Sequence, residues 1–164
     1  MAVLVAVALL AVAMPALDDA RTDTTIERLD AETEHLDRQL GALTAESVAV
    51  DEPELAARTT VTVRVPTGLT ASRVDRAAIG DPTLMEGVRT DETGPTSGRT
   101  SAPDVALVYR LAGSEPRVVP LSSSALPTLD VVDGPIRLRT GGTSRLRLTL
   151  VDDDGPTVRI ARVG

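Results

Sequence analysis

The chain begins with an unbroken apolar run. Residues Met1 to Leu17 (MAVLVAVALLAVAMPAL) carry no charged or polar side chain. As a helix, this segment would be about 25 Å long, close to the ~30 Å hydrocarbon thickness of a bilayer. A helix that is apolar on every side needs lipid or a large protein around it, and little chain remains to supply the latter. The run therefore predicts a membrane-spanning or secretory segment, with Pro15 marking its exit from the bilayer.

Whether this segment is a retained anchor or a cleaved signal peptide stays open. Residues 11–13 (AVA) place small side chains at a spacing that suits signal cleavage. No Lys or Arg precedes the run, so the basic segment typical of signal peptides is missing. We expect a single-pass protein of the cell membrane, held through residues 1–17, with its C-terminal domain outside. Secretion after cleavage is the alternative.

A heptad pattern replaces the apolar run after Asp18. Apolar or small residues recur at alternating steps of three and four, which places them on one face of a helix. This seam comprises Ile26, Leu29, Thr33, Leu36, Leu40, Leu43 and Ser47. We expect residues 18–50 to form an acidic amphipathic helix whose seam packs against the chain's own domain. A parallel homo-oligomeric coiled coil is the alternative.

Turn residues and alternating segments dominate the rest of the chain. The expected strands are Thr60–Val65, Ser72–Ile79, Asp104–Leu111 and Arg117–Leu121. Asp104–Leu111 is apolar on both faces, as in a central strand, whereas Thr90–Pro103 is rich in loop-forming residues. The expected fold class is α+β. A long N-terminal helix, made of the membrane segment and its acidic extension, precedes a mainly antiparallel β domain over residues 55–164.

Three alternating runs close the chain. They are Ile136–Arg139, Arg145–Leu150 and Val158–Ile160. Residues 153–155 suit a three-residue hairpin turn with Gly155 in the left-handed conformation. This turn predicts two apolar cross-strand pairs on one face, Leu150 with Val158 and Leu148 with Ile160.

A second hairpin is expected through residues 141–143. It would pair Leu138 with Leu146 and Ile136 with Leu148, and so place Arg139 opposite Arg145 and Arg137 opposite Arg147. Like charges directly opposed destabilise a sheet, so an anionic partner should cover them. The expected interaction face comprises Arg137, Arg139, Arg145, Arg147 and Arg159.

The charge distribution offers such a partner within the protein. The formal charge of −7 divides into −9 over residues 18–54 and +2 over residues 55–164. We hypothesise that the acidic helix, from this chain or a neighbour, meets the arginine face, because the guanidinium fork binds carboxylates bidentately. The alternative is that these arginines are the solvated side of an antiparallel sheet.

Composition excludes several kinds of chemistry. The chain has no Cys, Lys, Asn, Phe or Trp, which removes disulfides, thiol catalysis, Cys-bearing zinc sites and N-glycosylation. Net negative charge and the lack of stacking aromatics argue against nucleic-acid binding. Ser122–Ser124 have only His35 as an imidazole partner, and His35 is expected near the membrane, far from them. We therefore expect that the protein is not an enzyme and that it binds no cofactor and no metal.

The order of segments resembles a known family. An Ala/Leu/Val stretch ending in MPALDDAR is followed by RLDAETEHLDRQL, TVTVRVP, AAIGDP and a closing GGTSRLRLTLVDDDGPTVRIARV. Over most of its length the chain resembles an uncharacterised haloarchaeal family of short membrane-anchored proteins with a domain of unknown function. The resemblance implies an accessory role beside type IV pilus-like or secretion components. The acidic, Lys-free composition fits adaptation to molar salt, with GC-rich coding bias as the alternative.

The plan also resembles pilins and pseudopilins, in which a hydrophobic helix extends outward and is capped by a β domain. Two features differ, since no acidic residue falls within Met1 to Leu17 and no basic processing site precedes them. Our first hypothesis is a non-enzymatic, membrane-anchored extracytoplasmic protein. A secreted β-domain binding module and a pilin-like filament subunit are the alternatives.

Overall fold

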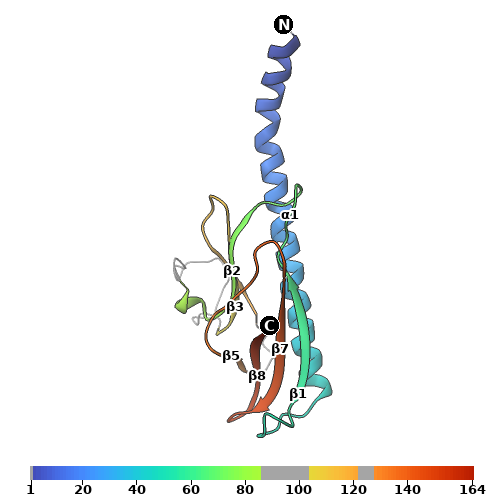
Figure 1. The fold of residues 1–164 in the computed structure, drawn as a ribbon, viewed down its shortest axis with the longest axis vertical. Coiled ribbons are helices and arrows are strands. Elements are labelled where there is room, and N and C mark those ends of the chain that lie inside the picture. Colours follow the sequence, from blue (N-terminus) through green and yellow to red (C-terminus); the bar gives the residue numbers. More distant parts are fainter. Residues whose placement is uncertain (1, 86–103, 122–127) are drawn as a thin grey trace, which may run out of the picture.

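The computed structural model describes residues 2–85, 104–121 and 128–164, with the backbone alone for residues 2–13. These residues form one long helix, α1 (Ala2–Glu46), followed by eight strands in two mostly antiparallel sheets. The expected α+β class is confirmed (Figure 1). The expected loop Thr90–Pro103 and the serines of residues 122–124 lie outside the described residues.

Helix α1 joins the two expected N-terminal segments into one continuous element. Pro15 lies inside it rather than at its end. Figure 1 shows its N-terminal half extending clear of the sheets and its C-terminal half lying alongside β1 (Ala57–Arg64). Residues 14–20 are exposed, and burial begins near Thr25. The projecting part from Ala2 to Ala20 is therefore about 28 Å long at ~1.5 Å per residue.

The C-terminal half of α1 is part of the hydrophobic core. Leu29, Leu36, Leu40 and Leu43 are all buried, and Ile26 is partly buried against the same cluster. That cluster also contains the inward side chains of β1 and β7 (Thr143–Asp152), including Val61, Val63, Leu146 and Leu148. The seam packs against the chain's own domain, as expected. It offers no free surface for a coiled coil.

The strands form two four-stranded sheets that share one core. Sheet A has the order β1-β7-β8-β5, and sheet B has the order β4-β3-β2-β6. The remaining strands are β2 (Val74–Gly80), β3 (Ala106–Leu111), β4 (Arg117–Pro120), β5 (Thr128–Val131), β6 (Ile136–Arg137) and β8 (Pro156–Val163), and a 3-10 turn, Pro82–Leu84, follows β2. Among these strands every pair is antiparallel except β5 with β8.

The four strands expected in the first part of the domain are present as β1 to β4. β3 lies inside sheet B between β4 and β2, as its apolar character on both faces predicts. β5 was not expected from the sequence. Its four residues alternate between polar and apolar, but the run is short, and only Leu129 is fully buried.

The hairpin between β7 and β8 has the expected register. Leu150 lies opposite Val158 and Leu148 opposite Ile160, with three residues in the turn. The left-handed position is Asp154 (φ 55°) rather than Gly155, whose φ is 138°. Aspartate tolerates this conformation better than most residues.

The expected hairpin through residues 141–143 is wrong. β6 pairs with β2 in sheet B, which places Ile136 opposite Ile79 and Arg137 opposite Ala78. β7 instead pairs with β1 along eight residues, so neither Arg139 with Arg145 nor Arg137 with Arg147 is a cross-strand pair. The longer partner satisfies more backbone donors and acceptors than the two-residue β6 could.

Candidate interaction surfaces

The outward side of sheet A carries arginine and threonine in a regular arrangement across β1 and β7. The cross-strand pairs on this side are Arg58–Thr149, Thr60–Arg147, Thr62–Arg145 and Arg64–Thr143. Each pair joins one arginine to one threonine, so no two arginines directly oppose each other. We call these eight residues the Arg–Thr face. The alternate residues of the same strands point into the core.

The structure redistributes the arginines expected on one face. Arg145 and Arg147 belong to the Arg–Thr face, and Arg159 of β8 lies beside it, opposite Thr149. Arg137 lies in sheet B, and Arg139 lies in the connection between β6 and β7. Sequence reasoning missed Arg58 and Arg64. Polar and apolar residues alternate along β1, which puts Arg58 and Arg64 on its polar side. They join this face only because β1 is the neighbour of β7.

Most of the charge on the Arg–Thr face has no counter-charge in the described part of the chain. Arg159 beside it is already paired, with Asp153 at 2.8 Å and Asp130 at 3.9 Å. The Arg58 guanidinium donates to the backbone carbonyl of Pro53. Arg64, Arg145 and Arg147 form no ion pair with any described residue, and all three are exposed. The result is a cationic sheet surface open to solvent.

A row of carboxylates follows one side of α1. We call Asp19, Asp23, Glu27, Asp30 and Glu34 the acidic stripe; all five are exposed and recur at steps of three or four. Glu34 lies 3.8 Å from Arg38, and the other four form no ion pair with described residues. Like charges at this spacing cost a helix a few tenths of a kcal/mol per pair.

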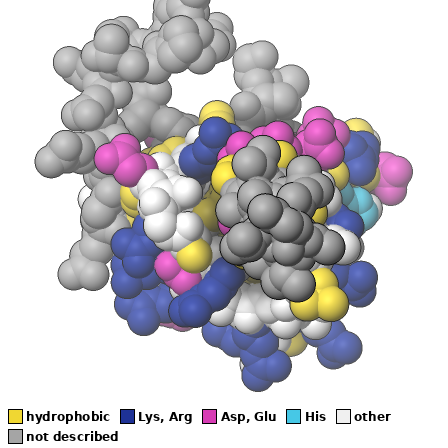
Figure 2. Space-filling view, turned by 90° about the horizontal axis from the view of Figure 1, so that it is seen from above, with side chains coloured by type: hydrophobic (Ala, Val, Ile, Leu, Met, Phe, Trp, Pro, Cys, Tyr) yellow, Lys and Arg dark blue, Asp and Glu magenta, His cyan; other side chains and the backbone are white. Residues whose placement is uncertain are grey.

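The acidic stripe and the Arg–Thr face lie on different sides of the molecule. Because α1 packs on the inward side of sheet A, its carboxylates do not reach the outward side. The contact between α1 and Arg64 is a hydrogen bond of 3.1 Å from the backbone N–H to the Glu32 carboxylate. In Figure 2 most Asp and Glu side chains gather at the upper right, and most arginines along the left and lower edges. Among the described residues no ion pair joins a carboxylate of α1 to the arginines of the Arg–Thr face, and contact with the helix of a neighbouring chain stays a prediction.

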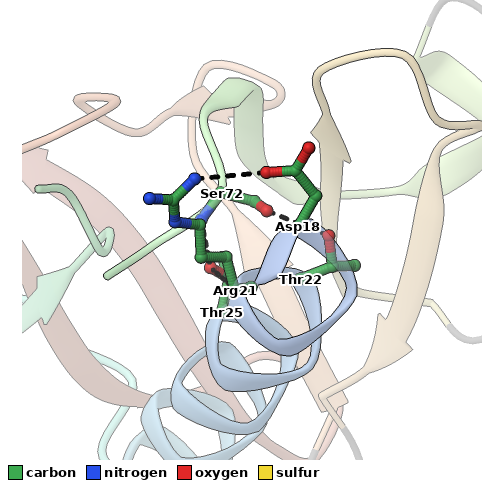
Figure 3. Close-up of polar contacts among 5 residues, drawn as sticks. All are labelled: Asp18, Arg21, Thr22, Thr25 and Ser72. Atoms are coloured by element: carbon green, nitrogen blue, oxygen red, sulfur yellow. Dashed lines mark hydrogen bonds and ion pairs between the residues drawn. The ribbon is translucent and has the colours of Figure 1, made fainter. Parts of the chain in front are cut away.

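A polar junction fixes the point where α1 leaves the domain. The Ser72 N–H, in the connection between β1 and β2, donates to Thr25 Oγ1 at 2.8 Å, and the Ser72 and Thr22 hydroxyls are 2.9 Å apart (Figure 3). Thr25 in turn donates to the Arg21 carbonyl, and Arg21 pairs with Asp18 at 3.1 Å. Thr25 is fully buried here. This junction holds the base of the projecting half in one direction.

A hollow of about 320 Å³ lies on the outward side of sheet B. Ala78 and Val108 form its apolar floor, since they are adjacent on β2 and β3. Its other lining residues include Arg76, Arg110, Arg137, Leu84, Met85 and Pro135. Guanidinium groups beside an apolar floor are able to bind a carboxylate attached to an apolar group.

Two buried polar atoms form no hydrogen bond that meets the usual geometry. They are the Tyr109 hydroxyl oxygen and Asp37 Oδ1. Burial raises the pKa of Tyr109, and the negative charge of Asp30 adds to this, while the nearby Arg117 guanidinium opposes it. Burial also raises the pKa of Asp37, with a smaller contribution from Glu34. Neither group is part of a cluster suited to catalysis.

Metal-binding clusters and membrane-spanning helices are absent from the part of the chain whose side chains the structure describes. No group of three or more His, Asp or Glu side chains there lies close enough together to hold a metal ion. No helix within that part is long and apolar enough to cross a membrane. Most of the apolar segment, residues 1–13, lies outside the described side chains.

A family model described as a domain of unknown function (DUF7311) matches residues 1–163. The chain belongs to this family. The expected membership of an uncharacterised family is thereby confirmed. Comparison with curated proteins and with solved structures finds no match.

Proposed function

We propose that the protein is a non-enzymatic, membrane-anchored extracytoplasmic protein, an accessory component of a type IV pilus-like or secretion apparatus in a haloarchaeon. In this proposal residues 1–17 form a single-pass anchor. The acidic half of α1 and the two sheets lie outside the cell.

The observation that carries the proposal is the continuity of α1. The apolar sequence of residues 1–17 leads without a break into a helical half that Leu29, Leu36 and Leu40 fix in the core. The junction with Ser72 adds a second restraint at the base of the projecting half. An anchor joined in this way would hold the domain in a fixed orientation above a bilayer, whereas a loose linker would not.

Fractionation of cells, followed by mass determination of the intact protein, tests the proposal. We expect the protein in the membrane fraction after washing in high salt and at high pH, with residues 1–17 retained. A full-length protein that is freely dissolved after lysis would refute the anchor. A protein released into the medium without its N-terminal residues would support the secreted binding module instead.

A matched pair of variants sharpens this test. Leu9→Arg places a charge within the apolar run, which costs about 2.5–3.5 kcal/mol at the centre of a membrane helix. We expect it to shift protein out of the membrane fraction. Leu69→Arg introduces the same side chain at a position that is 90% exposed, and its fractionation should be unchanged.

A pilin-like filament subunit is the second candidate. It is favoured by the arrangement of α1, which has one half projecting and the other packed against antiparallel strands. Electron microscopy of purified surface filaments, labelled with an antibody against the sheets, tests it. Filaments built of this chain would replace the accessory role, and filaments without the label would exclude it as a subunit.

A further inference from the structure

We propose that copies of this chain associate head to tail, with the acidic stripe of one copy lying on the Arg–Thr face of the next. A second copy of the chain is thus the partner in the proposed function. The proposal rests on that function, because anchoring in one membrane would align neighbouring copies. The contact itself does not require a membrane, because the Arg–Thr face and every stripe residue except Asp19 lie beyond the projecting part of α1.

The two surfaces agree in length. Arg58, Arg147, Arg145 and Arg64 occupy four successive levels of the outward side, two residues apart along the strands. At ~3.4 Å per residue these levels span about 20 Å. The acidic stripe runs from Asp19 to Glu34, which is about 22 Å along a helix.

Their repeats also agree. Same-side residues along a strand are about 6.8 Å apart, and helical residues four apart are about 6 Å apart along the axis. A helix lying along β7 can therefore present successive carboxylates to Arg145 and Arg147 without bending. The short threonines between the arginines leave room for the helix, and their hydroxyls can donate to carboxylates.

Each surface lacks what the other supplies. Arg64, Arg145 and Arg147 form no ion pair with described residues, and four of the five stripe carboxylates form none. Repulsion among the carboxylates of the stripe destabilises α1, and guanidinium groups of a second copy placed opposite them would remove this repulsion. Arginine forms bidentate contacts with carboxylates that depend on geometry as well as charge.

The placement of the surfaces determines the kind of assembly. Because they lie on different sides of one chain, the contact leaves a free stripe at one end and a free Arg–Thr face at the other. Such a heterologous contact repeats, and it generates either a ring or an open row of subunits. A closed two-fold dimer would instead require both surfaces of each chain to face the same partner at once.

Charge reversal tests the contact in the full chain, kept in a mild detergent and followed by sedimentation velocity. Arg145→Glu/Arg147→Glu and Asp23→Arg/Glu27→Arg should each weaken self-association at least about tenfold, because like charges then face each other. The chain with all four substitutions should regain most of it, since the reversed charges are again complementary. Arg110→Glu/Arg137→Glu, with the same change in net charge on sheet B, should associate like the unmodified protein.

Cysteine cross-linking locates the contact, because the chain has no cysteine of its own. A mixture of a Glu27→Cys chain and a Thr62→Cys chain should form a disulfide-linked heterodimer. Ala42→Cys, at an exposed position outside the stripe, should not link to Thr62→Cys. Predominant linkage between two Glu27→Cys chains would show a two-fold contact and overturn the proposal.

Two further results would overturn it. The first is self-association that Arg145→Glu/Arg147→Glu leaves unchanged. The second is loss of binding to vesicles of anionic lipid in that variant, while Asp23→Arg/Glu27→Arg leaves both vesicle binding and self-association unchanged. The Arg–Thr face would then bind lipid headgroups. Since sedimentation in detergent does not depend on fractionation in cells, failure of the anchor and failure of this contact are distinguishable.

Discussion

Replacing Leu40 by alanine tests whether α1 and the sheets form one cooperative unit. Leu40 is 0% exposed and belongs to the core shared with both sheets. The substitution removes the equivalent of three buried carbon groups, about 2.4 kcal/mol of transfer free energy at ~0.8 kcal/mol each. The cavity left behind adds to this, and Leu-to-Ala changes in cores cost about 2–5 kcal/mol in total. We therefore expect a loss of about 3 kcal/mol in the free energy of unfolding.

The measurement is equilibrium unfolding of the full chain in mild detergent. A loss of about 3 kcal/mol should lower the thermal midpoint by roughly 6–12 °C for a chain of this size. Far-UV circular dichroism follows the helix, and fluorescence of the chain's single tyrosine follows the core, because Tyr109 is 1% exposed. Both signals should change together.

Leu69→Ala is the matched control, since it is the same chemical change at a side chain that is 90% exposed. It should alter stability by less than about 0.5 kcal/mol. The reasoning would be refuted if Leu40→Ala cost less than about 1 kcal/mol, or if it reduced helix content while the Tyr109 signal stayed the same. Either result would mean that the seam of α1 is not part of the domain core.

Three other substitutions test local features. Burial raises the pKa of the Asp37 carboxyl above its ordinary 3.8, so the folded state binds the proton more tightly and stability should fall as pH rises from 3.8 through the raised value. Asp37→Asn should be more stable than the unmodified protein at pH 7 and equal to it below pH 3.8. Unfolding at a series of pH values measures this difference in stability, and a difference that shrinks as pH rises would contradict the prediction. Gly80→Ala should destabilise the protein by about 1–3 kcal/mol in urea unfolding, because its Cβ would lie 2.9 Å from the Pro135 Cα; an unchanged midpoint would contradict the close approach. Tyr109→Phe removes a buried hydroxyl without a partner and should be neutral or stabilising by up to about 1 kcal/mol in thermal unfolding, whereas a clear loss would reveal a hydrogen bond.

The features that the sequence predicts correctly are local ones. The seam of α1 follows from the spacing of its leucines, and the β7–β8 register follows from a three-residue turn between alternating runs. Periodicity within the helix is enough to show which side of α1 is buried, and turn length is enough to align β7 with β8, because their partner residues are close along the chain.

The features that it misses depend on contacts between distant segments. β1 and β7 are separated by most of the domain, and alternation shows that each needs a neighbour without saying which. The Gly141-Gly142 turn made a hairpin with β6 the nearest choice, although β6 has only two paired residues. The predicted arginine face was wrong for the same reason, because it depended on the pairing of β6 with β7. With β1 as the neighbour, opposed arginines become alternating arginine and threonine, and Arg58 and Arg64 join the surface.

The unbroken course of α1 makes it a lever. Its 45 residues measure about 67 Å from end to end at ~1.5 Å per residue. If the apolar end of α1 is held in place, a tilt of the helix axis by roughly 10° displaces Glu46 by about 12 Å at the other end. The two sheets would move with α1, because the buried leucines of its seam pack against them. Small angular changes at one extremity would thus become large displacements at the other.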